Sequence, residues 1–369
     1  MTGDTSSVIE DHDQDQDAAR DRLVAALSAA GIAIHQPTDR PLFTRTPEPS
    51  MVPMHWRWSQ LSGFLDELST VVELRPGGAR RTLRLANPGL EYGTTPTFWA
   101  SIQVILPGEV ATAHRHSASA FRFVMRGSGC RTTVNGENYP MRHGDLVLTP
   151  NWTWHDHVHE SSEPMIWLDV LDVSLMRSLE NVFFDPYPTD VQPLRPVPER
   201  SWAEFGSGLL RPPGPAPRRP ANPLLVYTHE QTVQALERAR SLPPDPTDDV
   251  ILEYQDPTSG GPVSPALSIK SQLLRAGFAG AAHRHSGSKV YWVIEGSGTT
   301  TVNGQRFDWG PGDFMAVPPW ATVRHHNPHD ADARLFRVDD SAVLRALNVY
   351  HEEIVTTAVG TGETGESAR

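Results

Sequence analysis

The sequence predicts an all-β protein that contains two copies of one β-barrel, with helix as a minor component. The 33 prolines and 28 glycines among 369 residues leave little room for long helices. Two stretches of the chain consist of short apolar or alternating runs separated by turn sequences such as NPG, GSG and NGE. These two stretches also repeat each other. A hydrophobic content of 38% over this length is enough for two cores of ordinary size.

The repeat is seen at matching turn and histidine positions. The sequence His-Arg-His-Ser starts at His114 and again at His283, an offset of 169. Gly-Ser-Gly recurs at the same offset, and the Asn-Gly, Gly-Asp and Trp152 positions recur at an offset of 168. One deletion reconciles the two offsets, so the chain is a duplication and each copy can be compared with the other.

Composition and periodicity divide the chain into six predicted segments. They are a disordered tail (1–20), a helical lead-in (21–80), a first barrel with the metal site (81–185), a proline-rich connector (186–265), a second, structural barrel (266–354) and a disordered tail (355–369). Apolar residues at helical spacing predict one helix over Asp21–Ile34 and another from about His229 to Ser241.

Charge and composition exclude several classes of function. The net charge is −12 and no dense run of lysine or arginine is present, so nucleic acid is not an expected partner. No apolar stretch has the roughly 20 residues that span a bilayer, and the acidic start lacks the features of a signal peptide. We therefore expect a cytoplasmic protein without a membrane partner. Cys130 is the only cysteine, so a metal site must use histidine and oxygen ligands.

A metal site is predicted in the first copy, at His114, His116 and His155. Residues two apart on a strand face the same side, so His114 and His116 both point into the barrel. A neighbouring strand can bring His155 beside them. An isolated His-x-His is more often a pair of hydrogen-bonded core histidines than a ligand pair, but the third histidine and the repeat favour ligands.

The spacing of these residues resembles the two cupin signatures, G-x5-H-x-H from Gly108 and G-x5-P-x-G-x2-H from Gly144, with Trp152 in place of the second glycine. The expected fold is therefore a double-stranded β-helix (jelly-roll) bicupin with a few peripheral helices. The signature also has a glutamate, and Ala120 stands at that position. Three neutral imidazoles leave the charge of the ion uncompensated and three octahedral positions open, which predicts an anionic chelating substrate.

The second copy has lost part of this ligand set. His283 and His285 remain, but Val323 replaces the third histidine and Lys289 replaces Ala120. A lysine repels a cation, so we expect a structural barrel. His325 lies two residues beyond Val323 and leaves a second metal site as the alternative.

The first barrel resembles the gentisate 1,2-dioxygenase family, which includes salicylate and 1-hydroxy-2-naphthoate dioxygenases. The segments that carry the resemblance are WRWSQ (56–60), NPGL (87–90), ILPGEVATAHRH (105–116), FRF (121–123), TPNWTWHDH (149–157) and WLDVLD (167–172). The resemblance implies Fe(II) as the cofactor, O2 and a small aromatic carboxylate as substrates, and a homo-oligomer, commonly a tetramer. The reaction that it implies inserts both atoms of O2 between the carboxylate-bearing and the hydroxyl-bearing ring carbons.

Site residues are carried over one by one from this resemblance. It implies the three histidines as iron ligands, Arg122 as the partner of the substrate carboxylate, and further pocket residues at Trp99, Gln103, His157 and Asp169. His157 is the candidate acid, base or hydrogen-bond donor, and Asp169 supports the pocket. Of the pair Arg80-Arg81 we expect Arg81 to contact the substrate. Ser101 stands where the family has glycine or alanine, a departure that favours a substituted substrate.

Arg122 is also predicted without the resemblance. It lies six residues after His116, so on one continuous strand it would face the same side, and a guanidinium suits bidentate capture of a carboxylate. Two other functions fit the histidines: a cupin reaction of another type on a chelating aromatic metabolite, or a non-catalytic cupin that binds a small molecule. Gentisate, substituted salicylates, amino-hydroxybenzoates and hydroxynaphthoates all remain candidate substrates.

Overall fold

The structure is a computed structural model that describes residues 6–34, 41, 43–74, 80–210, 213 and 222–355. The chain forms two units, Met1–Thr46 and Pro47–Arg369, and each is described by itself. The first unit contains one helix and the second contains both barrels. The predicted C-terminal tail lies, apart from Val355, outside the described residues, as do the first five residues of the predicted N-terminal tail.

Helix α1 spans Ser6–Ala29, which differs from the predicted disorder of residues 1–20 and from a helix that begins at Asp21. The sequence between these points is polar, but no proline or glycine occurs from Ser6 to Ala30, and the segment contains alanine, glutamine and arginine, which favour helix. Nothing therefore ends the helix at residue 20. The chain turns at Gly31, whose φ of 70° is one that glycine adopts without a Cβ penalty.

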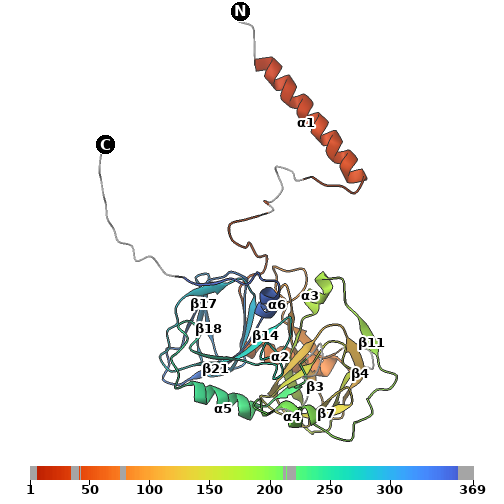
Figure 1. The fold of residues 1–369 in the computed structure, drawn as a ribbon, viewed down its shortest axis with the longest axis vertical. Coiled ribbons are helices and arrows are strands. Elements are labelled where there is room, and N and C mark those ends of the chain that lie inside the picture. The colour runs from red at the N-terminus through yellow and green to blue at the C-terminus, as the bar shows by residue number, and fades with distance from the viewer. Residues whose placement is uncertain are drawn as a thin grey trace, which may run out of the picture. The chain divides into compact units, whose positions relative to one another are not determined.

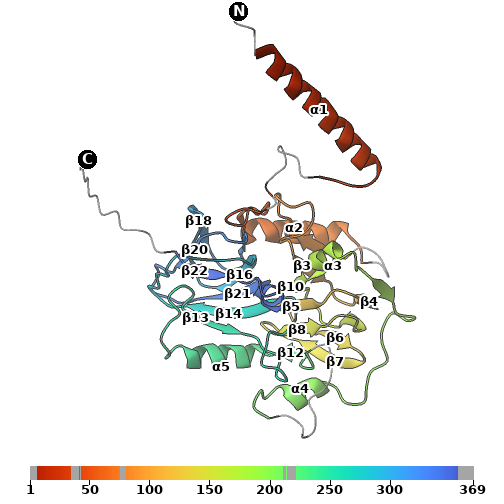
Figure 2. The same cartoon turned by 45° about the horizontal axis from the view of Figure 1, so that its top comes forward.

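Each barrel consists of a six-stranded and a five-stranded antiparallel sheet (Figures 1 and 2). In the first barrel the larger sheet has the order β12-β8-β5-β10-β3-β2, with strands β2 (Thr82–Arg84), β3 (Trp99–Ile105), β5 (Ala120–Arg126), β8 (Leu146–Thr149), β10 (Met165–Leu171) and β12 (Val226–Tyr227). The smaller sheet has the order β11-β4-β9-β6-β7, with β4 (Val110–His116), β6 (Cys130–Val134), β7 (Glu137–Met141), β9 (His155–His159) and β11 (Phe184–Pro186).

The second barrel repeats this arrangement. Its larger sheet has the order β1-β19-β16-β21-β14-β13, with β1 (Met54–Trp56), β13 (Val250–Glu253), β14 (Ser268–Leu274), β16 (Lys289–Glu295), β19 (Phe314–Val317) and β21 (Ala333–Asp339). Its smaller sheet has the order β18-β17-β20-β15-β22, with β15 (His283–His285), β17 (Gly298–Val302), β18 (Gln305–Trp309), β20 (Val323–His326) and β22 (Glu352–Ile354). The predicted all-β jelly-roll duplication is confirmed.

Segments that the sequence placed outside the barrels complete the sheets. Strand β1 belongs to the predicted helical lead-in, yet it pairs with β19 of the second barrel. The connector supplies β12, which pairs with β8 of the first barrel, and β13, which pairs with β14 of the second. Each borrowed strand covers a sheet edge whose peptide groups would otherwise lack hydrogen-bond partners.

In the described part of the second unit the helices are α2 (Trp58–Val71), α3 (Val173–Ser178), α4 (Arg200–Phe205), α5 (His229–Ala239) and α6 (Ser341–Ala346). Helix α5 is the helix predicted from His229. Its N-cap is Thr228, whose side chain accepts a hydrogen bond from the Gln231 amide. Among the described residues no helix is long and apolar enough to cross a membrane.

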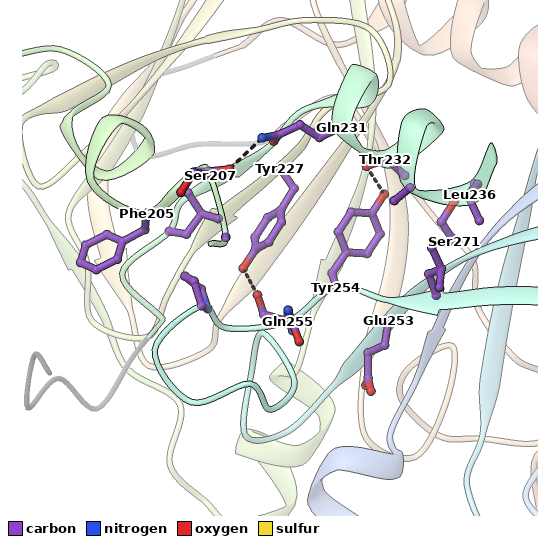
Figure 3. Close-up of a pocket in the computed structure, with 16 residues that line it drawn as sticks. Phe205, Ser207, Tyr227, Gln231, Thr232, Leu236, Glu253, Tyr254, Gln255 and Ser271 are labelled. Carbon is purple, nitrogen blue, oxygen red and sulfur yellow. Dashed lines mark hydrogen bonds between the residues drawn. The ribbon is translucent and has the colours of Figure 1, made fainter. Parts of the chain in front are cut away.

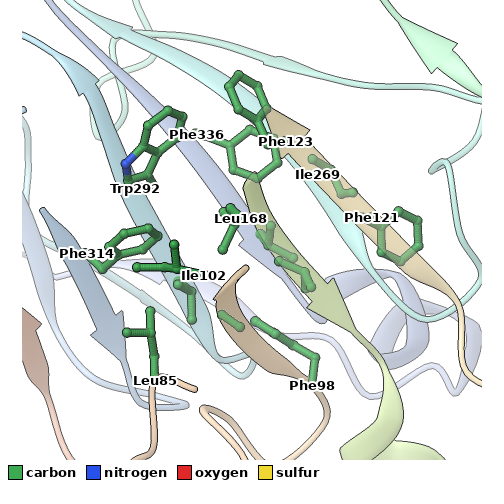
Figure 4. Packing of buried hydrophobic residues seen from close by; sticks show 14 of the residues in the cluster. Leu85, Phe98, Ile102, Phe121, Phe123, Leu168, Ile269, Trp292, Phe314 and Phe336 are labelled. Carbon is green, nitrogen blue, oxygen red and sulfur yellow. The ribbon is translucent and has the colours of Figure 1, made fainter. Parts of the chain in front are cut away.

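The two barrels share one hydrophobic core between their larger sheets (Figure 4). Phe123 of β5 packs against Trp292 of β16 and Phe336 of β21, with ring centroids 5.2 and 4.5 Å apart. Because this core takes side chains from both copies, the barrels bury apolar surface against each other and form one unit.

The repeated turn residues adopt repeated backbone conformations. Asn135 and Asn303 both have φ of 49°, and the glycine after each also has a positive φ. These are the two left-handed residues of a tight hairpin turn, for which Asn-Gly is the favoured pair. Trp152 and Trp320 have φ of 61° and 62°, so the position where the signature has glycine is left-handed in both barrels.

Candidate metal centre

The three predicted metal ligands meet on the smaller sheet of the first barrel. His114 and His116 are two residues apart on β4 and face the interior, and antiparallel pairing of β4 with β9 places His155 directly opposite His114. One ligand atom from each histidine lies within 4.8 Å of the others, and no other such group of metal-ligating side chains occurs among the described residues.

The backbone holds each imidazole in the tautomer that a metal needs. Nδ1 of His114, His116 and His155 lies 2.7, 2.7 and 3.0 Å from the carbonyl oxygens of Thr112, Ala118 and Thr153. A carbonyl oxygen only accepts, so each Nδ1 carries the proton and each Nε2 keeps its lone pair. Such contacts orient ligating histidines in metal proteins.

The electrostatics of the site also favour neutral imidazoles. Burial lowers the pKa of His114 to about 3, and it lowers the pKa of His116 and His155 as well. Nε2 of His155 is buried and has no hydrogen-bond partner in the described part of the chain, although a buried polar atom normally has one. Three neutral nitrogen donors without a carboxylate fit a divalent transition metal such as the Fe(II) that the resemblance implies.

A cavity of about 540 Å³ opens beside these histidines. Its walls combine cationic, polar and aromatic side chains: Arg80, Thr82, Arg84, Tyr92, Trp99, Ser101, Gln103, His114, His116, Arg122, His157, Asp169, Leu171, Val173 and Phe184. The predicted pocket residues Trp99, Ser101, Gln103, Arg122, His157 and Asp169 are all among them.

Arg122 is buried on β5 and is positioned by two neighbours. One of its terminal nitrogens donates to Thr149 Oγ1 at 2.8 Å. Its Nε lies 3.6 Å from Asp169 Oδ1, which is an ion pair too long to be a hydrogen bond. Arg122 Nε and Asp169 Oδ1 are both buried and otherwise unpartnered among the described residues. The guanidinium is therefore held in place with donor capacity left for a ligand in the cavity.

The expectation for Arg81 is wrong, and its neighbour Arg80 takes the position in the cavity. Arg81 points away and donates to the Glu109 carboxylate at 2.6 Å and to the carbonyl of Val72. Adjacent residues of an extended chain face opposite sides, so only one of the pair can enter the cavity. Burial, with the nearby Arg122 charge, lowers the pKa of Arg80 to about 10.

Among the cavity residues that the sequence analysis missed, three have cationic or aromatic side chains. Arg84 lies two residues beyond Thr82 on β2, and its guanidinium lies 5.0 Å from the centre of the Trp99 ring. Tyr92 meets the edge of Trp99 from a loop. Phe184 on β11 stacks on His114 with ring centroids 5.1 Å apart. The alternation from Arg80 to Arg84 along the chain was the one available signal, since it places Arg80, Thr82 and Arg84 on one face.

His157 and Ser101 are held by hydrogen bonds at the edge of the cavity. His157 Nδ1 lies 2.8 Å from Thr132 Oγ1, which leaves its other nitrogen for a ligand. Burial keeps the pKa of His157 well below its ordinary value, so the ring is neutral at pH 7. Ser101 donates to the carbonyl of Asp169 at 3.2 Å. The hydroxyl thus has an internal partner.

Trp152 is 44% exposed and Trp154 packs against Tyr187, so both lie outside the cavity.

A second cavity, of about 460 Å³, lies between α4, α5 and β13 and has a different character (Figure 3). Phe205, Tyr227 and Tyr254 contribute aromatic surface. Its polar groups pair with one another or with backbone, as in the contacts of Tyr254 with Thr232 and of Tyr227 with Gln255. It has no metal-ligating cluster and no cationic side chain, so the chemistry lies at the histidine site.

Comparisons with known proteins agree with this geometry. A cupin domain family model matches residues 101–171 and 271–339, one match in each barrel. The 5-aminosalicylate 1,2-dioxygenase of Comamonas sp. is 37% identical over 315 residues, which is 84% of this chain and 83% of that protein. The gentisate 1,2-dioxygenase of Streptomyces sp. is 37% identical over 340 residues, 89% of this chain and 94% of that protein.

The chain belongs to the gentisate 1,2-dioxygenase family. A crystal structure of the salicylate 1,2-dioxygenase of Pseudoaminobacter salicylatoxidans with gentisate has a TM-score of 0.84 and 31% identity, and the match covers 96% of this chain and 95% of that one. The predicted resemblance and the predicted bicupin fold are thereby confirmed for both barrels. The similarity extends over nearly the whole length of this family member.

Proposed function

We propose that this ring-cleaving dioxygenase holds one Fe(II) at His114, His116 and His155 and acts on a 2-hydroxybenzoate or a larger 2-hydroxy aromatic acid. The observation that carries the proposal is the combination of three Nε2 lone pairs without a carboxylate ligand and a set of arginines in the same cavity. The products expected are those of inserting both atoms of O2 between the carboxylate-bearing and hydroxyl-bearing ring carbons.

The charge of the cavity selects the substrate. The three imidazoles are neutral, and Asp169 is the one carboxylate among the cavity residues, against Arg80, Arg84 and Arg122. Bound Fe(II) adds two further positive charges. A carboxylate beside a phenolate supplies two negative charges on neighbouring groups, so it offsets part of the positive charge and can pair with the arginines and the ion at once.

The side chains divide the work of binding. Arg122, fixed by Thr149 and Asp169, binds the carboxylate, and Arg80 adds a second cation near His114. Gln103 and His157 are neutral hydrogen-bonding groups for the phenolic oxygen. His157 holds or releases a proton at the nitrogen that does not face Thr132. When bound, the iron supplies the redox chemistry that lets O2 react with the ring.

The aromatic walls determine which rings fit. Trp99 and Phe184 line the cavity with apolar surface, and Tyr92 contacts the Trp99 ring at its edge. Ser101 Oγ is turned to the Asp169 carbonyl, which places a hydroxyl rather than a bare glycine at this wall. A cavity of about 540 Å³ accommodates a substituted benzoate and also a hydroxynaphthoate.

Iron content and oxygen uptake test the proposal together. The purified protein is loaded anaerobically with Fe(II) and then exposed to air with salicylate, gentisate, 5-aminosalicylate or 1-hydroxy-2-naphthoate. We expect about one iron per chain, from the one complete ligand set, and O2 uptake that depends on one of these acids. The proposal fails if no acid stimulates O2 uptake, and acid binding without turnover would indicate the non-catalytic cupin.

A matched pair of histidine variants assigns the iron to one barrel. His114→Ala should lose iron and turnover, whereas His283→Ala, the equivalent change in the second barrel, should keep both. Equal loss in the two variants would place metal in both barrels.

The cytoplasmic location and the tetramer remain predictions from the sequence, and sedimentation of the purified protein tests the assembly.

A further inference from the structure

The second barrel keeps a polar interior at the positions that form the candidate site in the first. Residues of β3, β5, β9 and β10 have equivalents in β14, β16, β20 and β21. At the offsets of 168 and 169, Gln103 corresponds to Gln272, Arg122 to Tyr291, His157 to His325 and Asp169 to Arg337. All four of these second-barrel side chains are buried, three of them polar or charged at 3% exposure or less.

A carboxylate of the chain itself occupies this interior. Asp248, at the end of the connector, accepts a hydrogen bond from Arg337 Nη1 at 2.9 Å and one from Gln272 Nε2 at 3.3 Å. Its Oδ1 lies 3.7 Å from His325 Nε2. Burial alone would raise the pKa of Asp248, but Arg337 and the surrounding cationic groups hold it below its ordinary value. The barrel therefore surrounds an ionised carboxylate with a guanidinium, an amide and an imidazole.

A short turn over residues 245–249 carries this carboxylate into the barrel. Asp245 Oδ1 accepts hydrogen bonds from the amides of Thr247 and Asp248, and the chain pairs back on itself between Asp245 and Asp249. The Ala281 amide donates to the Pro246 carbonyl at 2.7 Å and ties the turn to the barrel. Pro246 is exposed whereas Asp248 is buried, so one thin turn separates solvent from the polar interior.

The first barrel has the opposite charge at the corresponding end. Arg80 lies two residues before β2, and Asp248 lies two residues before β13. Strands β2 and β13 pair with the equivalent strands β3 and β14, with Thr82 opposite Gln103 and Ile251 opposite Gln272. In this register Arg80 aligns with Asp249, and Asp248 lies one residue before the aligned position. In the first barrel the side chain at this end is a cation, Arg80, so the anion that pairs with it there is a bound ligand. The second barrel supplies the anion from its own chain.

The histidines of the second barrel do not favour a metal in this interior. His285 Nδ1 accepts a hydrogen bond from the Gly287 amide, and its Nε2 lies 3.1 Å from Arg337 Nη2, so N–H donors face both ring nitrogens. The Lys289 ammonium lies 3.1 Å from His283 Nε2, where a metal ion would bind. Burial first, and then the neighbouring Arg337, lower the pKa of Lys289 to about 7. Cationic donors surround the interior, which suits an anion.

We infer that the second barrel contains a carboxylate-binding site that Asp248 fills in the native chain, and that a small carboxylic acid binds there when this side chain is removed. The buried Arg337 guanidinium donates to two buried carboxylates, Asp248 and Asp339, and Lys270 also pairs with Asp339. Without Asp248 the guanidinium is left with a carboxylate that it shares with Lys270, and the excess positive charge is strongly unfavourable in a buried site. A free carboxylate of similar size restores the lost partner.

Chemical rescue of the full-length protein tests this inference. Asp248→Gly should lower the melting temperature by several degrees, and sodium formate or acetate should raise it again in a saturable manner at millimolar concentrations. Sodium chloride at equal ionic strength should not. The rise in melting temperature is also measured for the unmodified protein in each salt, and the variant must show the larger rise. This comparison removes any contribution from carboxylate binding in the first barrel.

Two further variants keep the test decisive. Asp308→Ala removes an exposed carboxylate that pairs with Arg306, and it should show no carboxylate-specific gain. Asp248→Gly combined with Arg337→Met should lose the rescue. If Asp248→Gly does not fold, Asp248→Ala, which also removes the carboxylate, is measured in the same salts. Equal stabilisation of Asp248→Gly by chloride and acetate, or an unchanged melting temperature, would overturn the inference.

Discussion

Arg122 shows at the scale of one residue how position and chemistry combine. The even-spacing argument assumed one continuous strand from His116 to Arg122, whereas β4 ends at His116 and Arg122 lies on β5 of the larger sheet. The arginine still lines the same cavity, because both sheets present alternate side chains to the barrel interior. Its partners come from other strands: Thr149 lies on β8 and Asp169 on β10. These partners hold a planar guanidinium whose remaining donors point to the cavity, which a flexible ammonium could not reproduce.

Arg122→Lys should therefore weaken substrate binding while the iron content stays unchanged. A charge-assisted hydrogen bond is worth about 1.5–3 kcal/mol, so we expect KM to rise about 10- to 100-fold, with a smaller change in kcat. Steady-state O2 uptake at matched iron loading measures this. Arg131→Lys, which alters a half-buried arginine paired with Glu160, is the control. Loss of iron in Arg122→Lys would mean that the residue supports the ligands instead.

Asp172 illustrates the scale of one element, because it joins three of them. It lies between β10 and α3, and its Oδ1 accepts a hydrogen bond from the Ser119 amide in the loop that joins β4 to β5. Among the described residues no cationic side chain forms a hydrogen bond or ion pair with this carboxyl, and burial raises its pKa to about 7. Asp340, its equivalent in the second barrel, has its pKa raised by burial to about 6.

This shift makes the stability of the β10–α3 junction depend on pH. The folded protein keeps the Asp172 proton up to about pH 7, whereas the unfolded chain releases it near pH 4, so ionisation costs folding free energy as the pH rises between these values. The slope is at most about 1.4 kcal/mol per pH unit. Asp172→Asn keeps the acceptor and removes the charge.

We therefore expect Asp172→Asn to gain stability relative to the unmodified protein as the pH rises from 5 to 8. Chemical denaturation at each pH measures the difference. Asp185→Asn, at a half-exposed carboxylate on β11, should show no such trend. A pH-independent difference for Asp172→Asn would contradict the raised pKa.

At the scale of the whole molecule, the shared core makes the two barrels one folding unit. Phe336 of the second barrel packs on Phe123 of the first at 4.5 Å, and Trp292 meets the same ring edge to face. The borrowed strands add to this coupling, since β1 crosses to the second barrel before the first barrel begins. The second barrel thus contributes apolar surface that the first cannot supply alone.

Phe336→Ala should destabilise both barrels in a single transition. Removal of a buried phenylalanine costs about 3–5 kcal/mol, and the cavity would lie between the two sheets. Denaturation followed by tryptophan fluorescence and by circular dichroism should give coincident curves, shifted to lower denaturant. Phe43→Ala, at a side chain that is 88% exposed, should change stability by less than about 0.5 kcal/mol. Separate transitions in Phe336→Ala would show that the barrels fold independently.

The features that the sequence determined by itself are local or repeated. Alternation along β4 placed His114 and His116 on one face, the Asn-Gly pairs marked the hairpins, and the repeat revealed both barrels and the lost ligand at Val323. These signals depend on neighbours within a few residues, where backbone geometry leaves few choices.

Contacts between distant segments were decided only by the tertiary structure. The choice between Arg80 and Arg81 depends on which of two opposite faces meets the cavity, and one residue of register reverses it. Strand β1 joins the second barrel, and Asp248 enters that barrel's interior from the connector, because β19 has an open edge and Arg337 needs a charge partner. The residues next to Met54 or Asp248 in the sequence predict neither contact. Each arises from packing against chain that is far away in sequence.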